Sequence, residues 1–374
     1  MWRRVAIAGV AIAVLVSCRG ILGLGDPEPY GPDASTGVTP DGETPVVTAD
    51  AAACNNANLV TDPKNCGRCG HDCRGGRCER ARCLPTVMTT ADSEVFAVRE
   101  GRVYAIASGM IIRAESPTQR FQLATNAVGK PRSLIASNAH IVWSGDDTGV
   151  RVCSLTGCGA DDPIQLSAPG KNTGPLVDVP ALNQLYPYVW ANYSDSTVEK
   201  AKDPGAPAVL STNTHVAENP CAAAFASLDA GAMIYDTPGK NFVVYPAAEA
   251  TGRDAGPADA QCAIAANSNT VFYTDSNTIW RAALNPDRTL GPRSAFVTGV
   301  IAPKVLVADE DFVYWAASTP ETDVVRCRVS GCGKPEVLVE GIPSVQSMAL
   351  EGSFLYFNVF LNATLGHVIY RVPN

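Results

Sequence analysis

The chain has 374 residues, of which 46% are hydrophobic and 18% are charged, and its formal net charge is -8. This composition excludes a disordered chain, a coiled coil and a collagen-like fibre. The acidic balance also argues against nucleic acid as a partner, because binding a phosphate backbone needs an excess of positive charge. The length allows two or three domains, or one large all-β domain with shorter elements before it.

Residues 1–17 have the pattern of a secretory signal peptide. Arg3 and Arg4 form a short basic opening, and an apolar run extends from Val5 to Val16. As a helix this run would span roughly 18 Å, well short of a hydrocarbon core of ~30 Å, so we expect it to be cleaved rather than retained as a membrane helix. The chain is therefore expected to enter an oxidising compartment.

The leader ends in Leu15-Val16-Ser17-Cys18, which resembles the lipobox of bacterial lipoproteins. In that family the cysteine thiol is acylated and the leader is cut before it, so the resemblance implies lipidation of Cys18 and a lipid bilayer as a partner. Two or three acyl chains, at about 0.8 kcal/mol per buried methylene, would hold the protein stably on a membrane. Because Arg19 follows, the resemblance implies the outer membrane, with the periplasmic or surface face left open. An ordinary cleaved leader with an incidental cysteine is the alternative.

Residues 18–53 are expected to form the lipidated cysteine and a flexible, disordered tether. After Cys18 the segment contains five prolines, six glycines and many Thr, Ser and Asp residues, and it shows no apolar periodicity. Such a composition buries too little apolar surface to offset the entropy that ordering costs. Its expected role is to separate the folded part of the chain from the membrane anchor.

Residues 54–84 are expected to form a small disulfide-rich knot. The segment holds six cysteines, Cys54, Cys66, Cys69, Cys73, Cys78 and Cys83. So short a segment cannot build a sufficient apolar core, and three disulfides would supply the missing stability. Six cysteines allow fifteen pairings, and the sequence does not choose among them. A zinc site is the alternative, because Cys66 and Cys69 have CxxC spacing and His71 lies beside them, but export favours disulfides.

The stretch from Thr61 to Gly70 resembles the core of stigma-specific-type cysteine-rich repeats, although one of the later cysteines of that family is missing. The knot is also locally basic, with Lys64, Arg68, Arg74, Arg77, Arg80 and Arg82 against Asp62, Asp72 and Glu79. The solvated surface of a small coreless module accounts for these charges. The functional alternative is contact with an anionic envelope polymer or with phosphorylated lipid headgroups.

Residues 85–374 show a degenerate repeat of about 42 residues. Each unit contains a short apolar strand, a polar turn, a strand that ends in aromatic residues, and a third strand that often precedes a basic residue. The aromatic strand recurs seven times, at Val103-Tyr104, Val142-Trp143, Val189-Trp190, Ile234-Tyr235, Phe272-Tyr273, Tyr314-Trp315 and Tyr356-Phe357. Four short strands in about 42 residues are typical of a β-propeller blade. We therefore expect an all-β fold, a single propeller of seven four-stranded blades, with the count open between six and eight.

The ends of the repeat predict how the ring closes. The seventh unit stops at Asn374 after its third strand, whereas Pro85 to Thr89 precedes the first unit without a blade of its own. We expect this N-terminal strand to be the fourth strand of the last blade, because such pairing removes two exposed edges. The pattern resembles bacterial seven-bladed propellers with degenerate YWTD-like repeats.

The six remaining cysteines predict three further disulfides. Cys153–Cys158 and Cys327–Cys332 share the same spacing, with a glycine before the second cysteine, so a tight turn could bring each pair together. Cys221 and Cys262 each open the first strand of consecutive units, and a Cys221–Cys262 bridge would join blade four to blade five.

The sequence contains no catalytic motif, so we expect no catalytic residues, no metal and no cofactor. The four histidines, His71, His140, His215 and His367, are scattered and form no HExxH pair. The acidic clusters Asp146-Asp147, Asp161-Asp162 and Asp309-Glu310-Asp311 fall at turns, where the turn preference of Asp explains them.

These features favour a membrane-anchored cell-envelope lipoprotein that is not an enzyme and that binds an unknown envelope protein or glycan through a propeller face. One alternative is an envelope hydrolase or lyase with an active site at the propeller channel, since propeller sites leave no linear motif. A second alternative is an outer-membrane assembly scaffold.

Overall fold

The computed structural model describes residues 59–374 except for 68, 126–130, 147, 159–162, 168–172, 179–187, 193–196, 201–207, 212–225, 228–232, 237–240, 246–252, 258–262, 275–276, 287–288, 302 and 318–320. The chain divides into two compact units, residues 1–48 and 49–374, and all described residues belong to the second. Every regular element among them is a β-strand. Within these ranges there is no helix with the length and apolar character that a membrane span requires.

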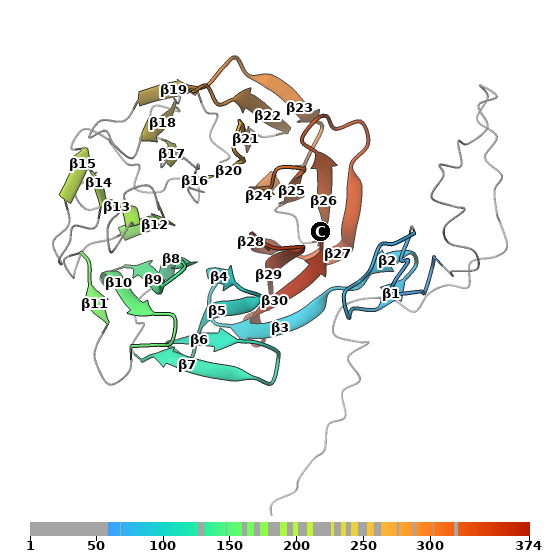
Figure 1. Cartoon of the computed structure of the whole chain (residues 1–374), viewed down its shortest axis with the longest axis horizontal. Helices are drawn as coiled ribbons and strands as arrows, with labels where there is room; N and C mark the ends of the chain where they lie inside the picture. The colour runs from blue at the N-terminus through green and yellow to red at the C-terminus, as the bar shows by residue number, and fades with distance from the viewer. Residues whose placement is uncertain are drawn as a thin grey trace, which may run out of the picture. The chain divides into compact units, whose positions relative to one another are not determined.

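The described strands form seven four-stranded antiparallel sheets, the blades, and one short hairpin (Figure 1). Blade one comprises β4 (Phe96–Arg99), β5 (Arg102–Ala107), β6 (Met110–Ala114) and β7 (Arg120–Ala124); blade two comprises β8 (Pro131–Ala136), β9 (His140–Gly145), β10 (Gly149–Ser154) and β11 (Ile164–Gln165); blade three comprises β12 (Thr173–Asp178), β13 (Tyr188–Asn192), β14 (Thr197–Lys200) and β15 (Ala208–Ser211). Blade four comprises β16 (Ala226–Ser227), β17 (Met233–Asp236), β18 (Asn241–Tyr245) and β19 (Arg253–Pro257); blade five comprises β20 (Ile264–Ala266), β21 (Thr270–Thr274), β22 (Thr278–Ala283) and β23 (Ser294–Thr298). Blade six comprises β24 (Pro303–Ala308), β25 (Phe312–Ala317), β26 (Glu321–Arg328) and β27 (Glu336–Pro343); blade seven comprises β28 (Val345–Glu351), β29 (Phe354–Asn362), β30 (Gly366–Pro373) and β3 (Thr86–Ala91).

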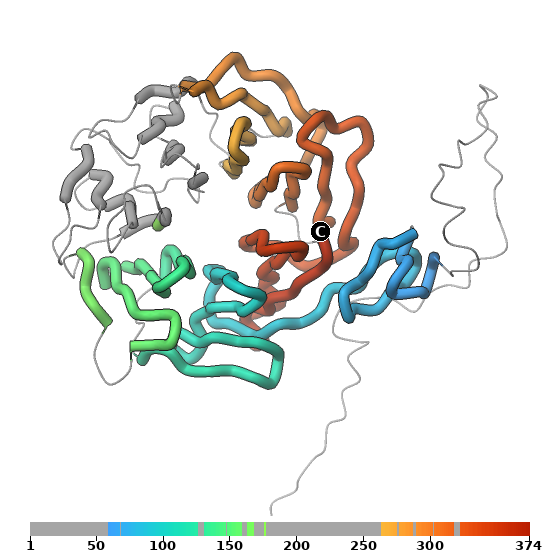
Figure 2. Tube along the Cα trace, viewed as in Figure 1, coloured from blue at the N-terminus to red at the C-terminus, as the bar shows by residue number. Residues whose placement is uncertain are grey.

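The seven blades form a closed ring. The first strand of each blade lies beside the first strand of the next, from β4 through β8, β12, β16, β20 and β24 to β28, and β28 lies beside β4 again. Figure 2 shows the part of this circuit that runs from blade five through blades six, seven and one to blade two along the Cα trace. The fold is therefore the predicted seven-bladed β-propeller, and its blade count matches the number of aromatic units in the sequence.

The ring closes as the sequence predicted. The N-terminal strand β3 pairs antiparallel with β30, so blade seven takes its first three strands from the end of the chain and its fourth from the beginning. Thr86 pairs with Arg371 at one end of β3 and Ala91 pairs with His367 at the other. Both termini of the propeller are thus held in one sheet.

The aromatic repeat is a row of buried cross-strand pairs. On the second strands of blades two, five, six and seven, aromatic residues pair with an aliphatic residue on the first strand, and the pairs are Trp143 with Leu134, Tyr273 with Ile264, Trp315 with Leu306, and Phe357 with Met348. All of these side chains are buried. Blade one departs from the predicted phase, because Ala105 pairs with Phe96 and its aromatic residue, Tyr104, lies one position earlier.

The basic residue of the third strand is a packing residue in four blades. It pairs across the sheet with an aromatic residue of the second strand, as Arg113 with Tyr104, Arg281 with Phe272, Arg326 with Tyr314, and Arg371 with Tyr356. Each guanidinium also lies over a phenyl ring, with its carbon 4.6 Å from the centre of Phe121, 5.8 Å from Phe296, 4.4 Å from Phe312 and 4.8 Å from Phe354, respectively. At these distances the cation is attracted to the ring face, which stabilises the strand pair.

The turns between first and second strands join neighbouring blades. Asp309 shows the local geometry, because its Oδ1 accepts hydrogen bonds from the backbone N–H groups of Asp311 (2.9 Å) and Phe312 (2.7 Å). The adjacent Glu310 carboxylate accepts bonds from the backbone and the hydroxyl of Ser268, in the equivalent turn of blade five (3.0 and 2.9 Å). The acidic cluster at 309–311 therefore serves turn formation and blade contact.

We predict that Asn358→Ala destabilises the ring by about 2–3 kcal/mol. Asn358 is fully buried; its Nδ2 donates to the Ser93 carbonyl (3.1 Å), and its Oδ1 accepts from Nδ1 of His367 (2.8 Å). Alanine would leave the Ser93 carbonyl and Nδ1 of His367 without the Asn358 amide as a partner, at the connection between blade seven and blade one. The midpoint of urea unfolding measures the change. Asn269→Ala, in the exposed turn between β20 and β21, is the control, and an equal effect of both substitutions would contradict the prediction.

Candidate functional site

The knot is built on a two-stranded hairpin of β1 (Cys78–Glu79) and β2 (Arg82–Cys83). Arg80 and Ala81 form its tip with positive φ angles of 51° and 62°, the conformation of a tight hairpin turn. The structure forms the disulfides Cys66–Cys78 and Cys73–Cys83, with Cα separations of 5.6 and 5.3 Å. Because Cys78 and Cys83 face each other across the hairpin, the two bridges fasten both preceding loops to the same strand pair.

The remaining two knot cysteines are described only in part. Cys69 is also disulfide-bonded, whereas Cys54 lies outside the described residues. Residues 1–53, with Cys18 among them, lie outside as well.

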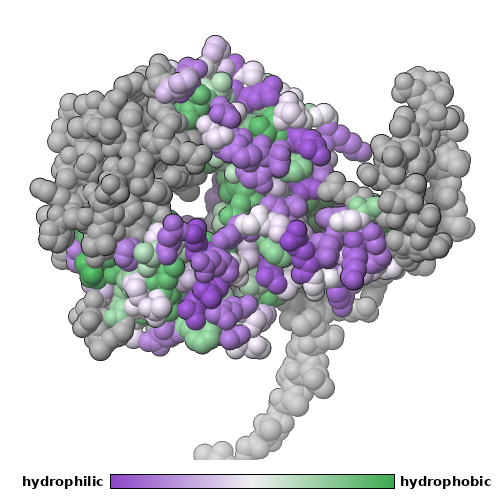
Figure 3. All heavy atoms as spheres, in the orientation of Figure 1, coloured by the Kyte–Doolittle hydropathy of each residue, from purple (hydrophilic) through white to green (hydrophobic). Residues whose placement is uncertain are grey.

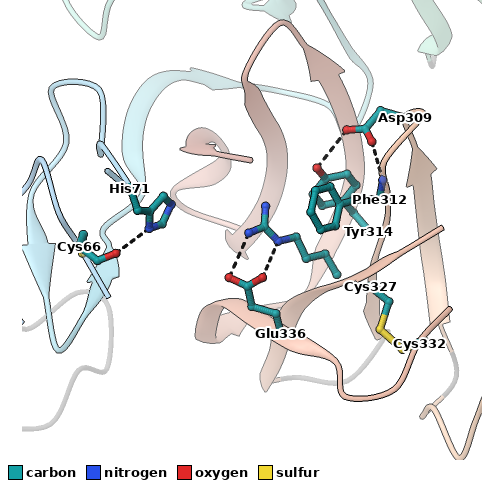
Figure 4. Close-up of polar contacts among 9 residues, drawn as sticks. Cys66, His71, Asp309, Phe312, Tyr314, Cys327, Cys332 and Glu336 are labelled. Carbon is teal, nitrogen blue, oxygen red and sulfur yellow. Dashed lines mark hydrogen bonds and ion pairs between the residues drawn. A yellow bond between two sulfur atoms is a disulfide. The ribbon is translucent and has the colours of Figure 1, made fainter. Parts of the chain in front are cut away.

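The zinc alternative is not supported in the described part of the knot. The sulfur atoms of Cys66, Cys73 and Cys78 lie within 4.8 Å of one another, the only grouping of potential metal ligands found among the described residues. All three are in disulfides, and an oxidised sulfur cannot supply the thiolate that zinc needs. Nδ1 of His71 instead donates to the Cys66 carbonyl at 2.7 Å (Figure 4).

The knot is docked on blades six and seven. Its strand β2 lies beside β27, the outer strand of blade six, and Arg82 forms an ion pair with Glu340 on that strand. The hydrogen bond from Arg82 is the main cause that lowers the pKa of Glu340. Arg74 lies over the ring of Phe354 on blade seven, 5.9 Å from its centre, and Arg371 of the same blade lies over that ring too.

Apolar burial adds to this docking. Four knot cysteines, Cys66, Cys73, Cys78 and Cys83, belong to one buried cluster with residues of blades six and seven, among them Leu338 and Val339 of β27. The disulfide sulfurs thus replace the apolar core that the knot lacks, and the outer edge of blade six is part of the same core. The knot is structurally continuous with the propeller.

Two disulfide-closed loops lie in blades two and six, where the sequence predicted them. Cys153–Cys158 and Cys327–Cys332 have Cα separations of 4.9 and 5.2 Å. In blade two the backbone N–H of Cys158 donates to the carbonyl of Leu123 in blade one (3.0 Å). The loop of blade six also contacts the preceding blade: the Val329 carbonyl accepts a bond from Arg281 of blade five (3.3 Å). The predicted partners Cys221 and Cys262 both lie outside the described residues.

Blade six contains a buried charge. Arg326 is 1% exposed, and its Nε and Nη2 donate to the two carboxylate oxygens of Glu336 at 2.9 and 3.0 Å (Figure 4). Beside it the Tyr314 hydroxyl donates to Oδ2 of Asp309 at 3.0 Å. Burial first, and the Asp309 carboxylate second, raise the pKa of Tyr314. The phenol therefore stays protonated at neutral pH and acts as a hydrogen-bond donor.

The three histidines in the described part of the chain do not converge. His71 lies in the knot, His140 opens the second strand of blade two, and His367 is the second residue of the third strand of blade seven. Burial lowers the pKa of His140 and of His367, which favours the neutral rings. Asp146 is paired with Arg132 at 2.9 and 3.1 Å, whereas Asp147, Asp161, Asp162 and His215 lie outside the described residues.

The surface over the knot is polar. In the view of Figure 3 hydrophilic residues predominate there. Lys64, Arg74, Arg77 and Arg80 are exposed, so the knot presents cations on the side that it does not bury. Asp72 and Glu79 are exposed there as well, so among the described residues of the knot the exposed charges are mixed, with cations in excess.

Comparisons with known proteins support the fold. No family model matches the chain, and no curated protein matches it. Among solved structures, streptogramin B lyase is similar with a TM-score of 0.56 and 10% identity over 78% of this chain and 93% of that one. The computationally designed Ika8 protein, in one of its crystal packings, is similar with a TM-score of 0.50 and 14% identity over 74% of this chain and 84% of that one. At these identities the likeness shows the propeller-like fold alone.

We predict that Glu336→Gln destabilises blade six by about 1–2 kcal/mol, because it removes the counter-charge of the buried Arg326, while the Glu336 side chain itself is 50% exposed and its charge is partly screened. The double variant Arg326→Met with Glu336→Gln should recover most of this loss, since it removes the buried charge as well. Urea unfolding of the two single variants and the double variant measures the coupling. Additive losses would show that the pair contributes nothing as a pair.

We predict that docking of the knot weakens in acid. Because the pKa of Glu340 is lowered in the folded protein, its contribution is present above its unfolded pKa and is lost as the pH falls through the folded value. Hydrogen exchange of the β1 and β2 amides should therefore accelerate at acidic pH relative to the blades. Glu340→Gln should show the fast exchange already at neutral pH, whereas Glu310→Gln, in a turn of the same blade, should not.

Proposed function

We propose that the chain is an exported cell-envelope lipoprotein, anchored in the outer membrane through acylated Cys18, and that it acts as a binding module through its propeller. The observation that carries the proposal is the combination of a leader ending in Leu15-Val16-Ser17-Cys18 with disulfides in both the knot and the blades. Disulfides persist in oxidising compartments, which is where a lipoprotein leader would deliver the chain. The two observations are independent and agree.

The propeller suits binding rather than movement. Its blades are joined by turn-to-turn hydrogen bonds, by disulfide-closed loops on two blades and by one shared sheet at the closure. A rigid ring presents the loops between its strands in fixed positions, which lowers the entropy that is lost when a partner binds. The proposed partner is an envelope protein or an envelope glycan.

The linker sets how far the ring can reach. If residues 18–53 are flexible, their root-mean-square span is roughly 30–35 Å. That length places the knot and ring close to the membrane surface, within reach of envelope partners. The proposal therefore needs both the anchor and a linker without fixed structure.

We predict that Cys18→Ser releases the protein from membranes, because acylation needs the thiol. Membrane fractions and detergent-phase partitioning of the wild type and the variant measure the change, and mass spectrometry of the N-terminal peptide reports the acyl chains. Ser17→Ala, which keeps a small residue before the cysteine, should stay on the membrane. Unchanged membrane attachment of Cys18→Ser would contradict the lipoprotein assignment.

Crosslinking of the intact lipoprotein in its own envelope tests the binding role. A specific envelope protein or glycan recovered with the wild type would support a binding module. Recovery of barrel-assembly components would favour the scaffold instead. Absence of any partner, together with turnover of an envelope glycan by the purified protein, would favour the hydrolase or lyase.

A further inference from the structure

We propose that the knot makes a second contact with the membrane, in which Lys64, Arg77 and Arg80 bind the phosphate groups of anionic lipid headgroups. The inference extends the proposed function, because it gives the anchored protein a preferred side toward the bilayer. It does not depend on acylation itself, since the contact is electrostatic.

Docking on the propeller divides the cations of the knot into two groups. Arg82 is paired with Glu340, and Arg74 lies over Phe354, so both are engaged with blades six and seven. Lys64, Arg77 and Arg80 are exposed. Arg80 also acts on Glu340 through its charge, as the last of the causes that lower the pKa of that carboxyl, after the hydrogen bond and the charge of Arg82. The exposed charged groups of this second group can still meet a partner outside the chain.

The nearby acids compete only weakly for these cations. Asp62 and Asp72 accept the backbone N–H groups two residues on, at Lys64 (2.9 Å) and Arg74 (2.7 Å), so at least one oxygen of each carboxylate is engaged within its own turn. The hydrogen bond from Asn65 is the main cause that lowers the pKa of Asp62. Arg77 is paired with Glu79, but the two side chains are 76% and 52% exposed, and such surface pairs contribute little.

Backbone geometry presents the basic side chains at turn tips. Arg74 and Arg80 both have positive φ angles, 50° and 51°, which residues other than glycine rarely adopt. The turn of β1 and β2 places Arg80 at the end of the hairpin, and the two disulfides hold that hairpin in position. The backbone that carries this cation is already ordered, so binding to a flat charged surface costs little further backbone entropy.

Chain order brings the knot to the bilayer. The knot is the first described element after the linker, and the lipid anchor would keep it at high effective concentration beside headgroups. Each Lys or Arg near an anionic membrane surface contributes about 1 kcal/mol, so three of them give roughly a hundredfold in affinity. A basic patch near a lipid anchor also strengthens the binding of the anchored protein to an anionic membrane.

The test uses the full-length chain with Cys18→Ser, purified with its disulfides intact, so that no acyl chain contributes. Co-sedimentation with phosphatidylcholine vesicles, with and without phosphatidylglycerol, measures binding as a function of salt. The knot variant carries Lys64→Gln, Arg77→Gln and Arg80→Gln. The matched control carries Arg120→Gln, Arg293→Gln and Lys334→Gln, three exposed cations of blades one, five and six with the same change in net charge.

We expect the parent and the control to bind anionic vesicles in a salt-sensitive manner, and the knot variant to bind roughly a hundredfold more weakly. Equal loss in both variants, or no binding of the parent, would overturn the proposal. Binding of the parent to inorganic polyphosphate but not to vesicles would overturn it in favour of an anionic polymer. Thermal unfolding of all three proteins is measured in parallel to show that each is folded at the assay temperature, because in the control Arg120 donates to Thr90 and Arg293 lies over the Trp280 ring. Cys18→Ser serves here as the common background, so this result is separate from the test of the anchor.

Discussion

The pairing of β3 with β30 is the interaction on which the rest of the structure depends. It joins a strand from the beginning of the propeller to the last strand of the chain, so the seven blades become one closed circuit. Without it, the third strand of blade seven would have an unpaired outer edge, and blade one would lose part of the neighbour against which Phe96 and Val103 are buried. After β3 the chain passes directly into blade one. Asn358, which is buried in blade seven, donates to the carbonyl of Ser93 in this connection and so holds the connection in place. Closure therefore fixes where the knot must lie, because the last knot strand, β2, precedes β3 by only two residues.

The blades are stabilised internally and joined to their neighbours by local contacts. Basic residues of the third strands stack on aromatic rings, and the polar turns after the first strands bind their neighbours. The disulfide loops add contacts to the preceding blade. In blade two Gly157 has a φ of +112°, and a Cβ there would lie 3.0 Å from the Leu123 carbonyl oxygen, so the close approach of this loop needs glycine. The cation–aromatic pairs act within a blade, whereas the polar turns and the disulfide loops act between neighbouring blades. All of them are local, which lets the repeat degenerate in sequence while its geometry persists.

Much of the fold could be predicted because it depends on short-range pattern. A period of about 42 residues, an aromatic second strand and an unmatched N-terminal strand indicate seven blades and their closure without any knowledge of contacts. The paired disulfides of blades two and six follow from spacing for the same reason. In blade one the phase differs by one position, since Ala105 pairs with Phe96 and the aromatic residue is Tyr104. The packing role of the basic residue in the third strand could not be predicted from the sequence. The ring that it covers comes from the fourth strand in blade one and from the second strand in blade six.

The docking of the knot could not be predicted, because its contacts join residues that are far apart in sequence and belong to no repeat. Arg82 meets Glu340, and Arg74 meets Phe354, at positions where a single charge or ring carries no periodic signal. The consequence for function lies in this docking. A knot that moved freely at the end of a linker would leave the ring free to turn in any direction above a membrane. A knot buried against blades six and seven is instead part of the ring, so its exposed cations keep a fixed place beside those two blades.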